Sequence, residues 1–277
     1  MYEILETVLL QSILGFIITA ILLVLKPFTS RKFPAKWQYL VWVTVLVTMI
    51  VPVYKLIPEK QVEKMAFIAE GGPAMPAITI FDEDADTQTV TLTEETEKET
   101  KITFKEEKQV NVPDLLVVVW LGGVLIFSLS VLISYFNYIT KMRRNSSDFF
   151  NILFEEVKKE LGIRRKIGLR ISKDVKSPML TGVFRPVIYL PEKELPPENL
   201  RMVLLHELTH YKRKDLPVKW FSMLVNAIHW FNPLCYILCN NLSSACEFAC
   251  DIAVTEKMTE ADRKIYMKTI LDLVEER

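Results

Sequence analysis

The sequence has no excess of charge of either sign, because 34 Lys+Arg balance 34 Asp+Glu in 277 residues. A neutral chain lacks the positive field that attracts nucleic acid, so we expect no direct nucleic-acid partner. Cysteine is also scarce, and all four cysteines lie within 235–250. Cysteines confined to one short stretch indicate no disulfide framework. What the chain has in excess is hydrophobic residues, which make up 50% of it.

The hydrophobic residues are concentrated in three long runs, at 7–25, 37–54 and 115–139. Each run is free of charged side chains and comes close to or exceeds the ~20 residues that a helix needs to cross a bilayer. Helices buried in a soluble core are the alternative, but such helices rarely lack a polar face over this length. The sequence therefore predicts three transmembrane helices.

The charges that flank these runs predict their orientation. Residues 26–36 carry four basic side chains and no acid, and Lys141, Arg143 and Arg144 follow the third run. Residues 58–112 instead carry 13 Asp+Glu against 6 Lys. The positive-inside rule then places 26–36 and everything after the third run in the cytoplasm. The N-terminus and the acidic stretch are expected outside.

These boundaries predict a multi-pass protein of the cell membrane, in contact with the lipid bilayer. Two transmembrane helices with a short basic cytoplasmic loop occupy 1–57, and an acidic extracytoplasmic loop occupies 58–112. The third transmembrane helix is expected over 113–140, and a cytoplasmic domain over 141–277. The outer loop is poor in large apolar residues, so we interpret it as a solvated spacer.

The cytoplasmic part has a mixed pattern of helices and strands. An amphipathic helix is predicted over 148–163, a strand over 166–172, and two strands joined by a turn over 177–191. A further helix is predicted over 196–215, with proline in its first turn and basic residues in its last. The expected fold is therefore a mainly α membrane protein whose cytoplasmic α+β domain contains a small sheet.

The helix over 196–215 carries His-Glu-Leu-Thr-His, from His206 to His210. Positions i and i+4 lie on one face of a helix, so both imidazoles can bind the same zinc ion. Glu207 lies beside them, where a water at the open coordination position needs a base. Composition alone gives roughly 0.003 such motifs in a chain of this length, so the pattern is specific. The alternative, two core histidines beside an unpaired buried glutamate, would be energetically costly.

A catalytic zinc site needs a third protein ligand. The remaining histidine, His229, lies in an apolar run, and Glu247 is the better candidate. Glu247 and Asp251 share one helical face among apolar residues, where a repelling surface pair is less expected. In this interpretation Glu247 binds the metal and Asp251 holds the second ring nitrogen of a ligand histidine. A four-thiolate zinc site is the rival, but the cysteine spacing is not typical of one and favours buried apolar cysteines.

The apolar run over 216–246 sets a constraint on topology. A single crossing would place Glu247 on the opposite side of the membrane from the two histidines, where one zinc ion could not bind all three. Asn232-Pro233 lies near the middle of the run and is typical of a helix break. We therefore predict two helices with a break near 231–233, packed in the domain or against the membrane interface.

Taken together, the sequence resembles the membrane-bound antirepressor metallopeptidases related to the bacterial β-lactam sensor-transducers. The resemblance covers essentially the whole chain and rests on the three apolar runs and on "HELTH" (206–210), "EFACD" (247–251) and "SPMLTGVFRPVIYLP" (177–191). It implies a gluzincin-type zinc metalloendopeptidase that binds one Zn²⁺ per chain. The implied metal ligands are His206, His210 and Glu247. Glu207 is the implied general base, and Asp251 is the implied hydrogen-bond partner of a ligand histidine.

The resemblance also implies how a substrate binds. A peptide would lie as an added strand along the edge formed by Leu180, Thr181, Gly182 and Val183. The substrate of this family is typically a cytoplasmic transcriptional repressor, and members can also cleave themselves. Charge patterning and a membrane location are compatible with a homodimer. Tyr189 and Tyr211 are nearby candidates for stabilising the oxyanion.

One part of the resemblance does not carry over. The sensor-transducers include a penicillin-binding domain, which needs a Ser-x-x-Lys nucleophile motif. Neither Ser-x-x-Lys nor Lys-Thr-Gly occurs in these 277 residues, so we expect no antibiotic-binding domain within them. Two other functions stay open. One is a membrane-protein quality-control peptidase with the same chemistry, and the other is a non-catalytic signalling module that contains zinc.

Overall fold

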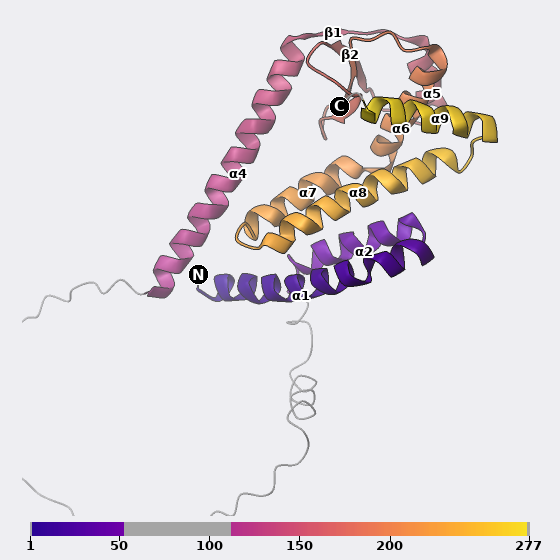
Figure 1. The fold of residues 1–277 in the computed structure, drawn as a ribbon. Helices are drawn as coiled ribbons and strands as arrows, with labels where there is room; N and C mark the ends of the chain where they lie inside the picture. The colour runs from indigo at the N-terminus through magenta and orange to yellow at the C-terminus, as the bar shows by residue number, and fades with distance from the viewer. Residues whose placement is uncertain (1, 53–111, 276–277) are drawn as a thin grey trace, which may run out of the picture. The chain divides into compact units, whose positions relative to one another are not determined.

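The computed structural model describes residues 2–52 and 112–275, and all of them except Val112 belong to one compact unit (Figure 1). The predicted 58–112 loop lies, apart from its last residue, outside the described residues. The helices are α1 (Tyr2–Lys32), α2 (Ala35–Thr48), α4 (Val112–Arg144), α5 (Ile152–Glu160), α6 (Pro197–Arg213), α7 (Asp215–Ile228), α8 (Pro233–Thr255) and α9 (Glu260–Glu275). The strands are β1 (Ser146–Asp148), β2 (Gly168–Ser172), β3 (Met179–Thr181) and β4 (Val187–Pro191). The predicted mainly α fold with a small sheet is confirmed.

Two of the three predicted transmembrane helices are long and apolar enough to span a bilayer, in α1 and α4. Within the structure only 28% and 6% of their most apolar windows are buried, so most of this apolar surface is exposed. α2 has 14 residues, or about 21 Å, which is shorter than the ~30 Å hydrocarbon core. A turn over 49–51 follows α2. A transmembrane helix over 37–54 is therefore not confirmed.

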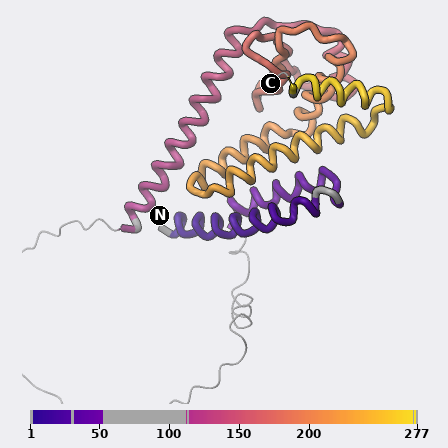
Figure 2. Tube along the Cα trace, in the orientation of Figure 1, coloured from indigo at the N-terminus to yellow at the C-terminus, as the bar shows by residue number. Residues whose placement is uncertain are grey.

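α2 packs against a hairpin of two helices, α7 and α8, and against α1 (Figures 1 and 2). The core between these helices is built from large apolar side chains, among them Leu46 of α2, Met49 directly after it, and Leu238 and Leu242 of α8. Each side chain of this kind stabilises the packing by about 1.5–3 kcal/mol when it is fully buried. α2 thus resembles a core helix in its contacts more than a lipid-facing one.

The predicted break near 231–233 is confirmed, because α7 ends at Ile228 and α8 begins at Pro233. Asn232 caps α8, since its side chain accepts a hydrogen bond from the backbone N–H of Leu234 at 3.0 Å. Pro233 suits the first helical position, where the backbone N–H has no intrahelical partner. The run over 216–246 therefore forms two helices that turn back on each other.

A second core lies under a four-stranded sheet with the order β1-β2-β4-β3. β2 and β4 are parallel, while the two outer pairs are antiparallel, so β3 is an edge strand. Leu204 and Leu208 of α6 pack with Ile188 of β4, and Cys250 and Val254 from the end of α8 join the same core. α8 therefore runs from one core into the other, and it brings its last turns against α6.

The predicted helix over 148–163 was too long. The structure has β1 at Ser146–Asp148 and starts α5 only at Ile152. The Asn151 side chain accepts a hydrogen bond from the backbone N–H of Leu153 at 2.9 Å, which fixes the start of the helix. Phe149 and Phe150 therefore lie in the segment before the helix and are not part of its apolar face.

Candidate metal centre

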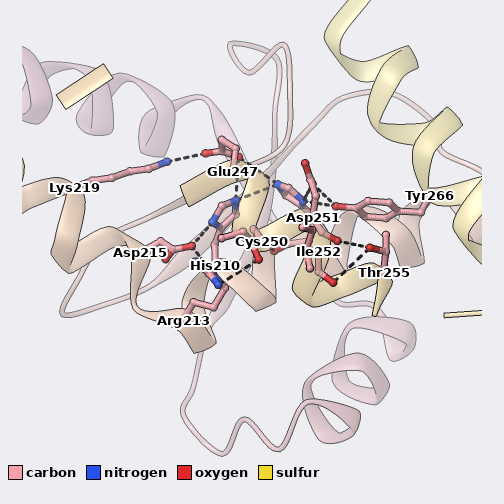
Figure 3. Close-up of polar contacts among 12 residues, drawn as sticks. His210, Arg213, Asp215, Lys219, Glu247, Cys250, Asp251, Ile252, Thr255 and Tyr266 are labelled. Carbon is pink, nitrogen blue, oxygen red and sulfur yellow. Dashed lines mark hydrogen bonds and ion pairs between the residues drawn. The ribbon is translucent and has the colours of Figure 1, made fainter. Parts of the chain in front are cut away.

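Three predicted ligand atoms meet at one point between α6 and α8 (Figure 3). The Nε2 atoms of His206 and His210 lie 3.0 Å apart, as expected for i and i+4 on one helix. Glu247 Oε2 lies 3.1 Å from His210 Nε2 and 3.6 Å from His206 Nε2. Ligands at 2.0–2.1 Å around a tetrahedral ion are about 3.3 Å apart. The spacing therefore fits three ligands of one metal ion, although their role as ligands stays a prediction.

The second ring nitrogen of His210 is held by Asp215, which the sequence analysis did not single out. His210 Nδ1 lies 2.8 Å from Asp215 Oδ2, and Arg213 donates to the same oxygen at 3.1 Å (Figure 3). Asp215 is fully buried. A carboxylate here keeps the proton on Nδ1, so the lone pair of Nε2 faces the other ligands.

His206 has an analogous pair of partners. Its Nδ1 lies 2.7 Å from the hydroxyl of Tyr266, which donates to Asp251 Oδ1 at 2.6 Å. Asp251 Oδ1 is itself 3.3 Å from His206 Nδ1. The structure thus places Asp251 behind a predicted ligand histidine, with Tyr266 bridging the two. This arrangement also leaves the lone pair of His206 Nε2 pointing at the shared point.

The charges around this point favour a cation between the ligand atoms. Burial lowers the pKa of His206, but hydrogen bonds with Asp251 and Glu247 outweigh it and raise that pKa to about 10. Burial also lowers the pKa of His210, but hydrogen bonds with Asp215, Cys250 and Glu247 raise it to about 12. For Glu247, burial raises the pKa, yet the two histidines hold it far below its usual value. The donor set therefore fits a metal ion, which supplies positive charge without protons.

Glu207 opens on the same space as the ligand atoms. A cavity of about 500 Å³, here called the catalytic cavity, is lined by Glu207, His206, Glu247 and Lys219 among others. The Glu207 side chain is largely buried, and burial raises the pKa of its carboxyl group, while the two histidines lower it. A carboxylate with a raised pKa is suited to taking a proton from water and releasing it again.

The predicted substrate edge lies beside Glu207. Leu180 and Thr181 belong to the edge strand β3, while Gly182 and Val183 form the turn that follows. The backbone of Leu180 is hydrogen-bonded to the Glu207 carboxylate, which places this carboxylate at the outer side of β3. Gly182 has a φ of 79°, a conformation that favours glycine. β3 is an edge strand, Gly182 and Val183 lie just beyond it, and the use of this edge by a substrate stays a prediction.

Lys219 is a further residue that sequence reasoning missed. Its Nζ donates to Glu247 Oε1 at 2.9 Å, which leaves Oε2 facing the two histidines. No local pattern in the sequence marks Lys219, because it reaches the site from α7 only once the chain has folded.

Neither tyrosine proposed for the oxyanion lines the catalytic cavity. Tyr189 is buried in a small cluster with Met142, and Tyr211 lines a different cavity.

The remaining histidine and the cysteines take the expected positions. His229 is fully buried at the far end of α7, where its Nε2 lies 3.0 Å from the Met49 carbonyl oxygen. All four cysteines are free, and three of them are buried. Among the described residues, one cysteine, Cys250, comes near the two motif histidines, with the ligand atoms within 4.8 Å of one another. This grouping contains one cysteine and two histidines, so it is not a four-thiolate zinc site.

Sequence comparisons identify the family. A family model described as BlaR1 peptidase M56 matches residues 6–277. This chain belongs to the BlaR1 peptidase M56 family. The regulatory protein BlaR1 of Bacillus licheniformis is 35% identical over 156 residues, which make up 54% of this chain and 25% of that protein. The methicillin resistance mecR1 protein of Staphylococcus aureus is 23% identical over 276 residues, or 96% of this chain and 46% of that protein.

The M56 family assignment confirms the resemblance to the sensor-transducers. It supports a peptidase of a membrane signal-transduction system, because the curated relatives carry regulatory and resistance names. The matched regions span less than half the length of these relatives. What the relatives do as whole proteins therefore reaches this chain only as a proposal.

Proposed function

We propose that this M56 protein is a zinc-dependent metalloendopeptidase of the cell membrane, which transduces a signal by cleaving a cytoplasmic repressor protein and also itself. The observation that carries the proposal is the convergence of His206 Nε2, His210 Nε2 and Glu247 Oε2 beside Glu207 on one cavity. The regulatory names of the relatives favour a signalling substrate over membrane-protein quality control.

Each residue of the centre has a definite task in this proposal. His206, His210 and Glu247 would hold the zinc ion, which would supply Lewis-acid chemistry at the scissile carbonyl group. Glu207 accepts the proton of the attacking water and later donates it to the leaving amine. Asp215 and the Tyr266–Asp251 pair keep both imidazoles in the tautomer that presents Nε2. The edge strand β3 is the element along which a substrate strand would pair.

The proposed topology has three crossings, by α1, by the segment over 37–54 that contains most of α2, and by α4, with the N-terminus outside and the peptidase domain in the cytoplasm. The tip of the α7–α8 hairpin contacts both α1 and α4. Asn232 Nδ2 donates to the Ser12 carbonyl oxygen at 3.1 Å, and Trp120 Nε1 donates to the Ile228 carbonyl oxygen at 3.0 Å. Because Ser12 and Trp120 lie inside the candidate spans, the hairpin would enter the membrane from the cytoplasmic side and return.

The experiment that tests this function compares the wild type with Glu207→Gln. Both proteins, purified in detergent, should contain about one zinc ion per chain by mass spectrometry of the metal. Cleavage of quenched fluorescent peptides should fall by about 10²–10⁴-fold in the variant, because the base is lost while the ligands stay. Glu198→Gln, in the exposed first turn of the same helix, is the matched control and should cleave like the wild type. Undiminished cleavage by Glu207→Gln would contradict the mechanism.

Cys250 provides a specific reason to test a non-catalytic zinc module. A thiolate at the fourth coordination position would close the site and leave no place for water. Cys250 is fully buried, its thiol donates to the His206 carbonyl oxygen, and it does not line the catalytic cavity. Our proposal therefore expects Cys250→Ser to keep its zinc and its cleavage activity. Loss of zinc in that variant, with a thiolate charge-transfer band in the cobalt-substituted wild type, would establish the closed module instead.

A further inference from the structure

β3 connects two cavities, one at each of its ends. Ser177 and Pro178, which precede the strand, line the catalytic cavity. Leu180, Gly182 and Val183 line a second cavity of about 530 Å³, and His210 also lines it. A peptide strand added to the outer edge of β3 would therefore pass from one cavity to the other along the face of the metal centre.

The second cavity, here called the basic cavity, has a strongly one-sided charge. Its lining contains the cationic side chains Arg164, Arg165, Lys212 and Lys214, and no acidic side chain among the residues described. Lys212 Nζ donates to the Leu161 carbonyl oxygen at 3.0 Å, and Arg165 donates to the carbonyl oxygen of Phe184. Backbone carbonyls orient these cations but leave their charge unbalanced.

Much of the remaining lining of the basic cavity is apolar. Its walls include Leu161, Ile163, Leu216 and Pro217, and the Phe184 side chain stands at the rim with 86% of its surface exposed. An exposed phenylalanine beside a cationic wall is suited to an occupant that carries both apolar and anionic groups. The four cations also repel one another when nothing anionic lies among them, so an anion lowers the energy of the cavity.

We infer that the basic cavity is a specificity site, which binds an acidic and partly apolar segment of the substrate on the N-terminal side of the scissile bond. The inference rests on the proposed peptidase function. β3 runs from the catalytic cavity towards the basic cavity, and an added strand pairs most favourably in the antiparallel direction. The N-terminal part of such a strand lies in the basic cavity, and its chain then continues to Glu207.

An anionic lipid headgroup could also occupy a cationic cavity with apolar walls. Lys214 and Leu216 lie where α7 begins, and α7 is part of the hairpin proposed to enter the membrane. The position of the cavity favours a peptide. One wall is the substrate edge itself and another carries the metal-centre residue His210, neither of which a lipid site requires. Binding of lipid in place of peptide is therefore an outcome that the test must separate.

The test uses the full chain in detergent with Glu207→Gln, so that peptides bind without being cleaved. Two fluorescein-labelled peptides differ only in carrying two glutamates or two lysines on the N-terminal side of a central apolar pair. Fluorescence anisotropy should show roughly tenfold tighter binding of the glutamate peptide at low salt, because several weak surface ion pairs add together. The preference should shrink as salt rises. Adding Arg164→Glu and Lys212→Glu should reverse it.

Lys264→Glu with Lys268→Glu is the matched control, because both lysines are exposed on α9 and line neither cavity. These changes should leave the glutamate preference as it is. Equal binding of the two peptides, or a preference untouched by the Arg164 and Lys212 changes, overturns the inference. So does a result in which those changes weaken only the binding of anionic phospholipid vesicles.

The outcomes also separate the inference from the proposed function. If the wild type cleaves both peptides equally well, the peptidase stands and the specificity site is wrong. If Glu207→Gln prefers the glutamate peptide while the wild type cleaves neither, the basic cavity stands and the peptidase is wrong.

Discussion

The two ends of the α7–α8 hairpin hold polar side chains with different kinds of partner. At the tip, the uncharged side chain of Asn232 donates to the carbonyl oxygen and the hydroxyl group of Ser12, and His229 Nε2 contacts the backbone carbonyl oxygen of Met49. At the opposite end, charged side chains pair with one another, as Lys219 does with Glu247. The hydrogen bonds at the tip therefore hold helices together, while the charged groups at the opposite end surround the candidate metal centre.

This difference shows what separates a structural histidine from a candidate ligand. All three histidines of the chain lie largely out of solvent, so burial does not distinguish them. His229 directs its Nε2 at a carbonyl oxygen, which occupies that nitrogen with a structural hydrogen bond. His206 and His210 are bound through Nδ1 and direct Nε2 at one another and at a carboxylate. The partner of each ring nitrogen decides the role.

The largest expected effect is at Glu247. Glu247→Ala removes one of three converging ligand atoms and leaves two histidines that cannot hold zinc tightly alone. Zinc content measured after dialysis should fall from about one ion per chain to nearly none. Glu256→Ala, at the exposed end of the same helix, should keep its zinc. Full zinc content in Glu247→Ala would show that the third ligand is another residue and would remove the contrast between the two ends of the hairpin.

A smaller effect is expected at Asp215. Asp215→Asn keeps the size of the side chain but removes the charge that holds the Nδ1 proton of His210. Partners of this kind typically contribute 10–100-fold to metal affinity, so zinc affinity measured by chelator competition should fall by roughly that factor. Asp148→Asn, with 90% of its side chain exposed, is the control and should bind zinc normally. An unchanged affinity in Asp215→Asn would mean that Asp215 only stabilises the turn.

The tip of the hairpin should respond in the opposite way. Asn232→Ala removes the cap of α8 and two hydrogen bonds to Ser12, of 3.1 and 2.8 Å. Loss of a cap costs about 0.5–2 kcal/mol, so the free energy of unfolding should fall by about 2 kcal/mol. Zinc affinity should stay unchanged. Denaturant unfolding beside Asn240→Ala, an exposed asparagine of the same helix, checks this; a large loss of zinc affinity would show that the tip also shapes the metal centre.

Local patterns predicted much of the site. The i, i+4 spacing placed His206 and His210 on one face, and the same spacing placed Glu247 and Asp251 together on α8. Asn232-Pro233 predicted the hairpin, because a capping side chain and a missing N–H both mark a helix start. These features depend on neighbours in the chain, so the sequence carries them directly.

The rest of the site depends on packing between distant elements. Tyr266 reaches His206 from α9, and Lys219 reaches Glu247 from α7, over separations that no local period encodes. Asp215 is close to His210 in sequence, yet its approach needs Lys214 to take a left-handed conformation. Glycine is the usual signal for such a turn, and a lysine gives none. The outcome for the second predicted span also depends on packing, because part of the apolar surface of α2 lies against α8.

The smallest expected effect is at this turn. Among the residues described, Lys214 alone combines a side chain with a positive φ, of 61°. A residue with a Cβ is strained there by roughly 1 kcal/mol, and glycine is not, so Lys214→Gly should raise the free energy of unfolding by about 0.5–1 kcal/mol. Zinc affinity should stay the same, because Asp215 keeps its place against His210. Lys212→Gly, two residues earlier in helical backbone, should instead lower stability by about 1 kcal/mol. Equal losses in both variants would show that the turn is not strained and that the lysine side chain itself holds it.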